Sequence, residues 1–288
     1  KNKLAVTVDT YNEGIHFLNF KYPDLIIKKI IRSSISDLIS KGVVPKYYFI
    51  SASLKKNTIN KIIAEKIIKS LAIEQKKFNI KISGGDTTTG VTNSFTITSI
   101  GFSNKIIERN HAKINDDIYV TGNIGDSFIG LQLIKKKIKL NNKKSNFFFK
   151  RKYYVPDVPF NSIKIIKKFA NTSIDVSDGL IGDLNKLINK QNVNYILDIK
   201  KIPTSKLFKD LINSNNFNIE NLLFNGDDYQ TLFTSSSKNK KKIFTSFKKM
   251  NQKVTIIGKI IKKSESNFLK IGKKYKNIRN YKGYLHNV

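Results

Sequence analysis

One stretch of the sequence shows most clearly how this chain is organised: Ser173-Ile174-Asp175-Val176-Ser177-Asp178-Gly179-Leu180. A short run of strand-forming residues ends in polar residues and a glycine, and apolar residues at helical spacing then continue towards residue 190. A strand that turns through glycine into a helix is typical of proteins that pack helices on a sheet. The aspartates beside the glycine also place carboxylate oxygens at the end of a strand.

The same alternation of strand and helix patterns extends in both directions. Apolar residues at three- and four-residue spacing predict helices over 24–41, 58–77 and 161–170. Short β-branched or aromatic runs predict strands over 4–8, 47–52, 80–82, 95–102, 118–121, 195–199, 231–234 and 254–260. We interpret 83–88 as a glycine-rich loop and the basic segment 135–152 as a helix end plus surface loop.

A polar stretch around residue 110 separates two halves that each contain helices and strands. We therefore expect an α/β (α+β) fold of two domains, 1–110 and 111–288, each a mixed sheet packed with helices.

The composition excludes several classes of function. With 288 residues and 40% hydrophobic content, the chain can bury a substantial core. It contains no cysteine, which excludes a disulfide framework, a catalytic thiolate, a zinc ribbon and an iron–sulfur cluster. No apolar run approaches the roughly 20 residues that span a bilayer, and no signal-peptide pattern is visible, so we expect a cytoplasmic protein with no membrane partner.

The net charge is strongly positive, because 53 Lys and Arg stand against 21 Asp and Glu to give +32. Such a charge makes nucleic acid a candidate partner. Only four of the cations are arginines, namely Arg32, Arg109, Arg151 and Arg279, and the lysines are spread along the whole chain. Nucleic-acid recognition usually clusters its charges and uses arginine for bidentate contacts, so we favour an ordinary lysine-rich enzyme surface and expect no nucleic-acid partner.

The few acidic residues gather in short polar segments. They occur in Asp9-Thr10, Ser36-Asp37, Gly84-Gly85-Asp86-Thr87, Asp175-Val176-Ser177-Asp178-Gly179 and Gly226-Asp227-Asp228. Mg²⁺ prefers one or two carboxylates together with water and phosphate oxygens, and backbone N–H groups beside glycine can bind a phosphate. Neither a P-loop nor a Gly-x-Gly-x-x-Gly motif is present, so phosphate binding needs another arrangement. Each aspartate taken alone could instead cap a helix or close a turn.

Taken together and in order, these segments resemble the thiamine-monophosphate kinase family. The resemblance rests on residues 7–17, Ser36-Asp37-Leu38 before Gly42 and Pro45, 84–88, 119–122 with Gly125-Asp126, 174–180, 226–229 and 283–286. The family is part of the aminoimidazole ribonucleotide synthetase superfamily. The resemblance therefore implies that superfamily's two-domain fold, ATP binding without a P-loop and a homodimer formed through the N-terminal domain. It also implies ATP-dependent phosphorylation of thiamine monophosphate to thiamine diphosphate, assisted by several Mg²⁺ ions.

The resemblance further implies a role for individual residues. The implied metal ligands are Thr7, Val8 through its backbone, Asp9, Asp37, Asp86, Asp175 and Asp178. The implied ATP contacts are Gly85, Asp86, Arg109 and Ser177. The implied contacts to thiamine monophosphate are His16, Asp227 and Tyr284. The acceptor is a phosphate oxygen that is already anionic near neutral pH, so no catalytic base is expected and the reaction depends on positioning and charge neutralisation.

The sequence departs from the family pattern at several positions. The given sequence begins after the point where the family has its Gly-Asp-Asp-x-Ala segment, whose first aspartate binds metal, so we expect domain 1–110 to lack its front edge and one metal ligand in the chain as given. Asp227 replaces the usual glutamate, 156–159 lacks the family's arginine, and 110–112 lacks its Ser-Gly-Ala. Two alternatives stay open: another ATP-using enzyme of the superfamily, of the aminoimidazole ribonucleotide synthetase or selenophosphate synthetase type, and a basic nucleic-acid-binding protein.

Overall fold

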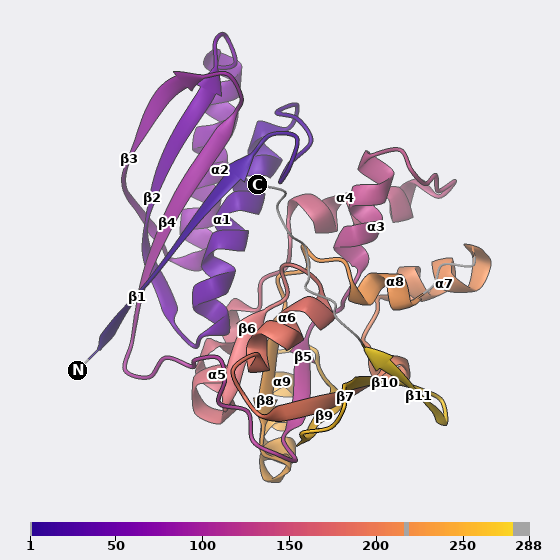
Figure 1. Cartoon of the computed structure of the whole chain (residues 1–288). Helices are drawn as coiled ribbons and strands as arrows, with labels where there is room; N and C mark the ends of the chain where they lie inside the picture. Colours follow the sequence, from indigo (N-terminus) through magenta and orange to yellow (C-terminus); the bar gives the residue numbers. More distant parts are fainter. Residues whose placement is uncertain (1, 216–218, 279–288) are drawn as a thin grey trace.

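The computed structural model describes residues 2–215 and 219–278. Two β-sheets lie side by side, and helices pack against each of them (Figure 1). The α/β (α+β) fold class predicted from the sequence, with mixed sheets packed by helices, is therefore confirmed.

The first sheet contains β1 (Lys3–Asn12), β2 (Val44–Lys55), β3 (Lys81–Gly90) and β4 (Ser94–Ser103), in the spatial order β1-β4-β2-β3. β2 and β3 run parallel, whereas β4 is antiparallel to both β1 and β2. Helices α1 (Pro23–Ser40) and α2 (Lys61–Phe78) cover one face of this sheet (Figure 1). In the described part of the chain no helix covers the opposite face, where Leu4, Val6 and Val8 are exposed.

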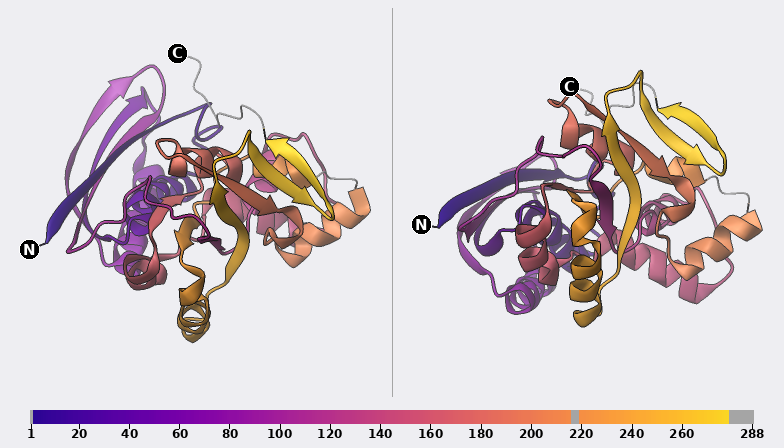
Figure 2. Two further views of the ribbon diagram at one scale, coloured as in Figure 1. Left: turned by 60° about the horizontal axis from the view of Figure 1, so that its bottom comes forward. Right: turned by 90° about the horizontal axis from the view of Figure 1, so that it is seen from below.

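The second sheet contains β5 (Asp117–Thr121), β6 (Thr172–Asp175), β7 (Val193–Asp198), β8 (Thr231–Ser235), β9 (Val254–Lys262), β10 (Asn267–Ile271) and β11 (Lys274–Ile278). Its spatial order is β11-β10-β7-β9-β5-β8-β6. The β10–β11 hairpin lies at the end farthest from the first sheet (Figure 2).

The remaining helices are α3 (Asp126–Ile134), α4 (Lys143–Tyr154), α5 (Ile163–Phe169), α6 (Leu180–Ile188), α7 (Lys206–Asn215), α8 (Ile219–Leu223) and α9 (Lys240–Lys249). Short 3₁₀ turns occur at Phe160–Ser162, Ile199–Lys201 and Ser237–Asn239.

Helix α1 joins the two layers. Pro23 stands in its first turn, where a proline suits the helix, and Gly42 follows its end in a left-handed conformation with φ 71°. Ile26 and Ile30 are buried in the core beneath the first sheet, and α1 also contacts β6 and β8 of the second sheet. Polar residues on α1, such as Asp37, can therefore meet residues from both sheets.

Helices α7, α8 and α9 and strands β10 and β11 were not predicted from the sequence, and several predicted segments have different bounds. β1 and β3 are longer than expected because each pairs with its neighbour along its full length, so Asp9 and 84–87 lie inside strands rather than in turns. The segment 135–152 is not mainly a loop, because α4 occupies much of it. The side chain of Asn142 caps α4 by accepting hydrogen bonds from two backbone N–H groups. Phe149 of this helix is fully buried against neighbouring helices.

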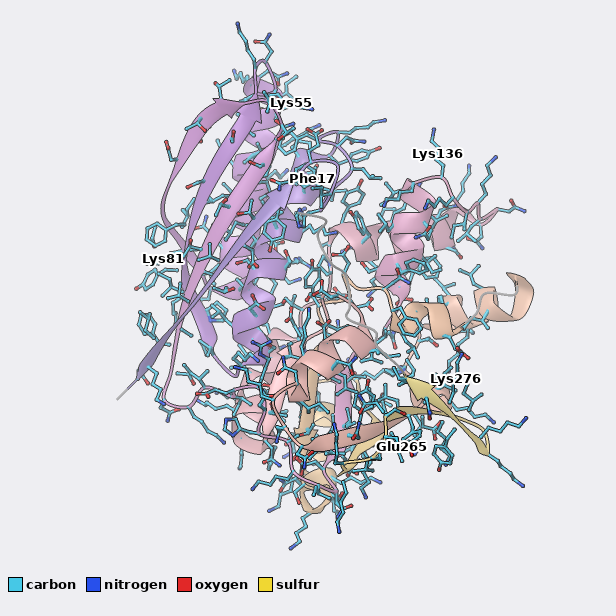
Figure 3. All side chains as sticks on the ribbon, viewed as in Figure 1. Phe17, Lys55, Lys81, Lys136, Glu265 and Lys276 are labelled. Carbon is cyan, nitrogen blue, oxygen red and sulfur yellow. The ribbon has the colours of Figure 1, made fainter. Side chains whose placement is uncertain are left out.

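Exposed lysines occur along the whole described chain. The labelled Lys55, Lys81, Lys136 and Lys276 project from widely separated parts of the molecule (Figure 3). This distribution matches the lysine-rich surface expected from the composition. Within the described ranges, no helix combines the length and the apolar composition that crossing a bilayer requires.

Candidate active site

A cavity of about 620 Å³ opens where β1 and α1 of the first layer face the turns that follow β6 and precede β8. Of the residues singled out in the sequence, it is lined by Val8, Asp9, His16, Asp37, Asp175, Ser177, Asp178 and Asp227. Segments from both halves of the sequence therefore converge on one cavity.

β1 and α1 place three oxygen-bearing side chains beside one another. The Thr7 hydroxyl donates a hydrogen bond of 2.6 Å to Oδ2 of Asp37. Burial, and then the charge of Asp37, raise the pKa of Asp9 to about 6. Oδ2 of Asp9 is buried and has no hydrogen-bond partner among the described residues. A cation bound here would offset the repulsion between the two carboxylates and would give the unsatisfied Oδ2 of Asp9 a partner.

Asp175 reaches the same place from the end of β6. It is buried, and burial followed by the charge of Asp37 raises its pKa well above the usual value. The Ser36 hydroxyl on α1 donates a hydrogen bond to Oδ2 of Asp175. Nearby, Lys41 donates to the backbone oxygen of Ser173, and burial lowers the pKa of Lys41 to about 8. These contacts join α1 directly to β6.

The donor set fits a divalent cation that is shared with a nucleotide. Within residues 2–215 and 219–278, no three acidic or histidine side chains converge into a complete metal cage. Mg²⁺ does not require one, because it usually takes one or two carboxylates and completes its shell with water and phosphate oxygens. The unsatisfied Oδ2 of Asp9, with Asp37 close enough to raise its pKa, provides this kind of partial site.

Asp183, which the sequence analysis missed, fixes the turn that carries Ser177 and Asp178. Its Oδ2 accepts hydrogen bonds of 2.9 Å from the backbone N–H groups of both residues. Lys186 forms ion pairs with Asp178 and, at 3.3 Å, with Asp183. The available signal was an aspartate in the first turn of a helix that follows Gly179.

The segment before β8 packs on this turn. The N–H of Asp227 donates to the oxygen of Ser177 at 2.9 Å, and the N–H of Tyr229 donates to the oxygen of Val176 at 2.8 Å. A Cβ at Gly226 would overlap the carbonyl oxygen of Ser177, so the approach requires glycine there. Asp227 and Tyr229 have φ values of 68° and 51°, a left-handed conformation that is unusual for such residues.

His16 belongs to a turn on the other side of the cavity. The backbone N–H of Asn12 donates a 2.9 Å hydrogen bond to its Nδ1. The Tyr153 hydroxyl donates a 3.0 Å hydrogen bond to the backbone oxygen of His16. Phe17, which follows it, is 1% exposed and anchors the turn in the core. The turn is therefore held from both β1 and α4.

The structure does not bring Asp86 to this cavity within one chain. The strand pairing places Asp86 in one row with Ser51, Thr96 and Thr10, three strand spacings from β1. At about 4.8 Å per spacing, Asp86 lies about 14 Å from the row position next to Asp9. One Mg²⁺ ion bound at about 2.1 Å cannot contact both carboxylates.

The other predicted contacts also lie apart from the cavity or cannot be placed. Gly85 lies next to Asp86 on β3, where the backbone of Ile50 leaves no room for a Cβ. Arg109 is exposed in the connection between β4 and β5, and its charge contributes to the lowered pKa of Lys41. Tyr284 lies outside the described residues.

Comparison with known proteins gives the family. Residues 1–103 match the family described as AIR synthase related protein, N-terminal domain. Thiamine-monophosphate kinase of Buchnera aphidicola subsp. Acyrthosiphon pisum is 35% identical over 261 residues, which cover 90% of this chain and 80% of that protein. Thiamine-monophosphate kinase of Haemophilus influenzae is 32% identical over 280 residues, which cover 94% and 83% of the two chains.

Solved structures agree with the sequence comparison. Thiamine monophosphate kinase from Aquifex aeolicus superposes with a TM-score of 0.81 at 26% identity, covering 93% of this chain and 88% of that one. A structure named "AaThiL complexed with AMPPCP and TMP" superposes with a TM-score of 0.84 at 28% identity, covering 95% and 86%. The resemblance read from the sequence motifs is thereby confirmed, and the chain belongs to the thiamine-monophosphate kinase family.

Proposed function

We propose that this protein transfers the γ-phosphoryl group of ATP to the phosphate of thiamine monophosphate and releases thiamine diphosphate and ADP. The observation that carries the proposal is the single cavity in which Asp9, Asp37 and Asp175 face His16 and Asp227. The relatives named thiamine-monophosphate kinase and the structure that holds AMPPCP and TMP support it.

The chemistry suits a cavity without an activated nucleophile. The phosphate of thiamine monophosphate loses its second proton near pH 6, so its oxygen is nucleophilic at neutral pH without a base. We propose that Asp9, Asp37, Asp175 and Asp178 hold Mg²⁺, with oxygens from the Thr7–Val8 segment. When bound, Mg²⁺ supplies charge neutralisation for the phosphoryl groups.

The protein itself contributes position. The turn of Ser177 and Asp178, fixed by Asp183, offers its hydroxyl and carboxylate to the nucleotide side of the cavity. Arg109 and the backbone at Gly85 are further proposed nucleotide contacts. On the other side, the Asp227 carboxylate is suited to the positively charged thiazolium ring of the substrate, and His16 and Tyr284 are proposed to contact it.

We also propose a homodimer that forms through the uncovered face of the first sheet. On this face Leu4, Val6 and Val8 are 58%, 51% and 61% exposed. Phe102 on β4, which pairs with Leu4, is also exposed. An exposed apolar sheet face of this kind is suited to packing against another sheet. We favour a second copy of this chain as the partner, because Asp86 shares this face and would approach a nucleotide bound to the other copy.

The proposed activity can be tested with purified protein, ATP, Mg²⁺ and thiamine monophosphate. Formation of thiamine diphosphate with equal amounts of ADP supports it. Absence of product, together with turnover of an aminoimidazole ribonucleotide precursor or of selenide, would assign the chain to another activity of the superfamily. The domain division at residue 110 and the cytoplasmic location stay predictions.

A further inference from the structure

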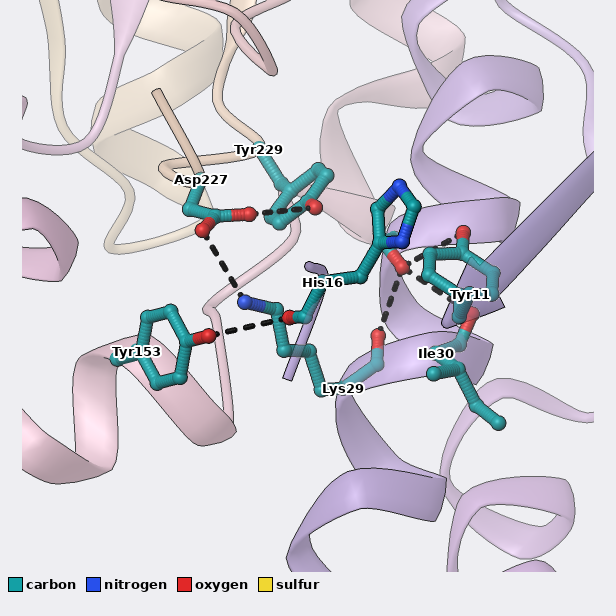
Figure 4. Close-up of polar contacts among 8 residues, drawn as sticks. Tyr11, His16, Lys29, Ile30, Tyr153, Asp227 and Tyr229 are labelled. Carbon is teal, nitrogen blue, oxygen red and sulfur yellow. Dashed lines mark hydrogen bonds and ion pairs between the residues drawn. The ribbon is translucent and has the colours of Figure 1, made fainter. Parts of the chain in front are cut away.

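A buried lysine lies beside the cavity. Lys29 on α1 is 1% exposed, and its Nζ lies 3.1 Å from Oδ2 of Asp227 and 3.5 Å from the centre of the Tyr153 ring (Figure 4). Burial lowers the pKa of Lys29, whereas the charge of Asp227 raises it. Packing alone does not explain a buried cation, because an apolar side chain of similar volume often stabilises such a position as well or better.

Lys29 holds one of the two oxygens of Asp227. The hydroxyl of Tyr229 donates a 2.8 Å hydrogen bond to Oδ1, and Lys29 donates to Oδ2 at 3.1 Å. The side chain of Asp227 is still 29% exposed and lines the cavity. Because each carboxylate oxygen has two lone pairs, Asp227 can accept these bonds and still face a ligand. Its orientation is therefore set by two side chains, one from each half of the sequence.

The same lysine also supports the opposite side of the cavity. The ring of Tyr153 packs against the ammonium group of Lys29, and its hydroxyl donates to the backbone oxygen of His16 at 3.0 Å (Figure 4). On α1, the Ser33 hydroxyl bonds both the Lys29 carbonyl oxygen, at 2.9 Å, and the Tyr11 hydroxyl of β1, at 2.8 Å. Lys29 thus lies between the two segments that carry His16 and Asp227.

We propose that Lys29 is a positioning residue for the acceptor substrate: it holds the Asp227 carboxylate, and through Tyr153 the His16 turn, in the arrangement that binds thiamine monophosphate. This inference rests on the proposed function. Lys29 acts through Asp227 and Tyr153, and it forms no hydrogen bond or ion pair with the carboxylates proposed to hold Mg²⁺. Its loss is therefore expected to weaken binding of the acceptor and to leave binding of ATP unchanged.

The test is the Lys29→Met variant, which keeps an unbranched side chain of similar length and removes the charge. We expect its KM for thiamine monophosphate to rise about tenfold, the value of one charge-assisted hydrogen bond, while its KM for ATP stays within about twofold. Arg32→Lys is the matched control, because Arg32 is buried one turn further along α1 and contacts Glu74 instead of the cavity. Arg32→Lys should lower thermal stability without raising either KM.

A double-mutant cycle separates positioning from a merely structural role. In an Asp227→Asn background, Lys29→Met should raise the KM for thiamine monophosphate no further than about twofold, because only the part of its effect that passes through Tyr153 and the His16 turn is then left. Tyr229→Phe, which frees Oδ1 of Asp227 and changes little volume, should raise the same KM and serves if Lys29→Met does not fold. Equal rises in both KM values, or effects that add fully in the cycle, would overturn the inference. If the unmodified protein turns over ATP only with a different acceptor, the proposed function fails instead.

Discussion

The guanidinium group of Arg32 forms a two-pronged ion pair with Glu74, with 2.8 Å between Nε and Oε2 and 2.9 Å between Nη2 and Oε1. Its Nη1 also donates to the carbonyl oxygen of Pro156 at 3.0 Å. Arg32 is 4% exposed and Glu74 is fully buried. This pair therefore ties α1, α2 and the segment after α4 together inside the core.

Removing one partner of this pair should be more damaging than removing both. Glu74→Leu leaves the Arg32 charge buried without a counter-charge, and we expect a loss of about 3–5 kcal/mol in the free energy of unfolding. Combining it with Arg32→Met should recover most of that loss, because two apolar side chains then fill the space. Urea unfolding monitored by circular dichroism measures both. A single variant that loses less than about 1 kcal/mol would show that the pair is exposed in solution.

Asp126 makes stability depend on pH in the direction opposite to a salt-bridged acid. Burial raises its pKa from 3.8 to about 6, against the lowering effect of the 2.7 Å hydrogen bond from Ser205. The folded protein therefore holds the proton more tightly, and the stability that this group contributes is complete below about pH 4 and is lost as the pH rises through 6. Asp126→Asn stays neutral and keeps an acceptor for Ser205.

We expect Asp126→Asn to match the unmodified protein near pH 4 and to be more stable by up to about 3 kcal/mol above pH 7. Chemical unfolding at a series of pH values gives the difference between the two proteins, which removes the contribution of other titrating groups. A difference that does not change with pH would contradict the raised pKa of Asp126.

Much of the fold could be predicted because apolar spacing reports burial directly. The helix predicted over 24–41 occurs as Pro23–Ser40, since its buried isoleucines recur at the period of a helix. The lengths of β1 and β3 could not be predicted, because pairing with β4 and β2 sets them and no local pattern records that pairing. α4 was not predicted because its many lysines and its asparagine make the segment polar overall, and its buried face, which includes Phe149, is short.

The acids of the candidate site were easier to find than their partners. Asp9 and Asp175 stand out in a sequence with only 21 acidic residues. Lys29 is one cation among 53 Lys and Arg, and its only signal is a position on the apolar stripe of α1. The distance of Asp86 from Asp9 follows from the order of the strands, which sequence periodicity does not contain.

Asp183 offers a test of the turn that carries Ser177. Asp183→Ala removes the acceptor of two backbone N–H groups, so we expect kcat/KM for ATP to fall about 10–100-fold, as for other residues that orient a metal or ligand site. Asp183→Asn keeps an oxygen acceptor and should lose much less. Steady-state kinetics at several Mg²⁺ concentrations checks this. Equal activity of Asp183→Ala and the unmodified protein, at the same thermal stability, would exclude a role for this support.

The proposed homodimer should dissociate when a charge is placed on the uncovered face of the first sheet. Val6→Glu places a charge among the exposed apolar residues of β1 on the uncovered face, and it should shift the protein from dimer to monomer in sedimentation velocity at micromolar concentration. Val91→Glu is the matched control, because Val91 is 91% exposed but lies in the turn between β3 and β4. Monomeric unmodified protein would refute the dimer. Dissociation of the dimer by both variants would show that the effect of Val6→Glu is not specific to the uncovered face.

The exposed position of Asp86 on β3 allows its effect on activity to be measured apart from its effect on stability. Its side chain is exposed, so Asp86→Asn should change the free energy of unfolding by no more than about 0.5 kcal/mol, while turnover of thiamine monophosphate falls steeply if the carboxylate holds Mg²⁺. Unfolding of the variant would instead make Asp86 a structural residue.

Mixing variants shows whether Asp86 acts on its own chain or on a second copy. Asp86→Asn and Asp175→Asn are each expected to be nearly inactive, and a mixed dimer holds one complete site only if the two aspartates of a site come from different chains. Because half of randomly mixed dimers are hybrids with one intact site each, activity should return to about a quarter of the unmodified value. Activity that stays at the level of the separate variants would place Asp86 and Asp175 in a site of the same chain and would contradict the assignment of Asp86 to a second copy.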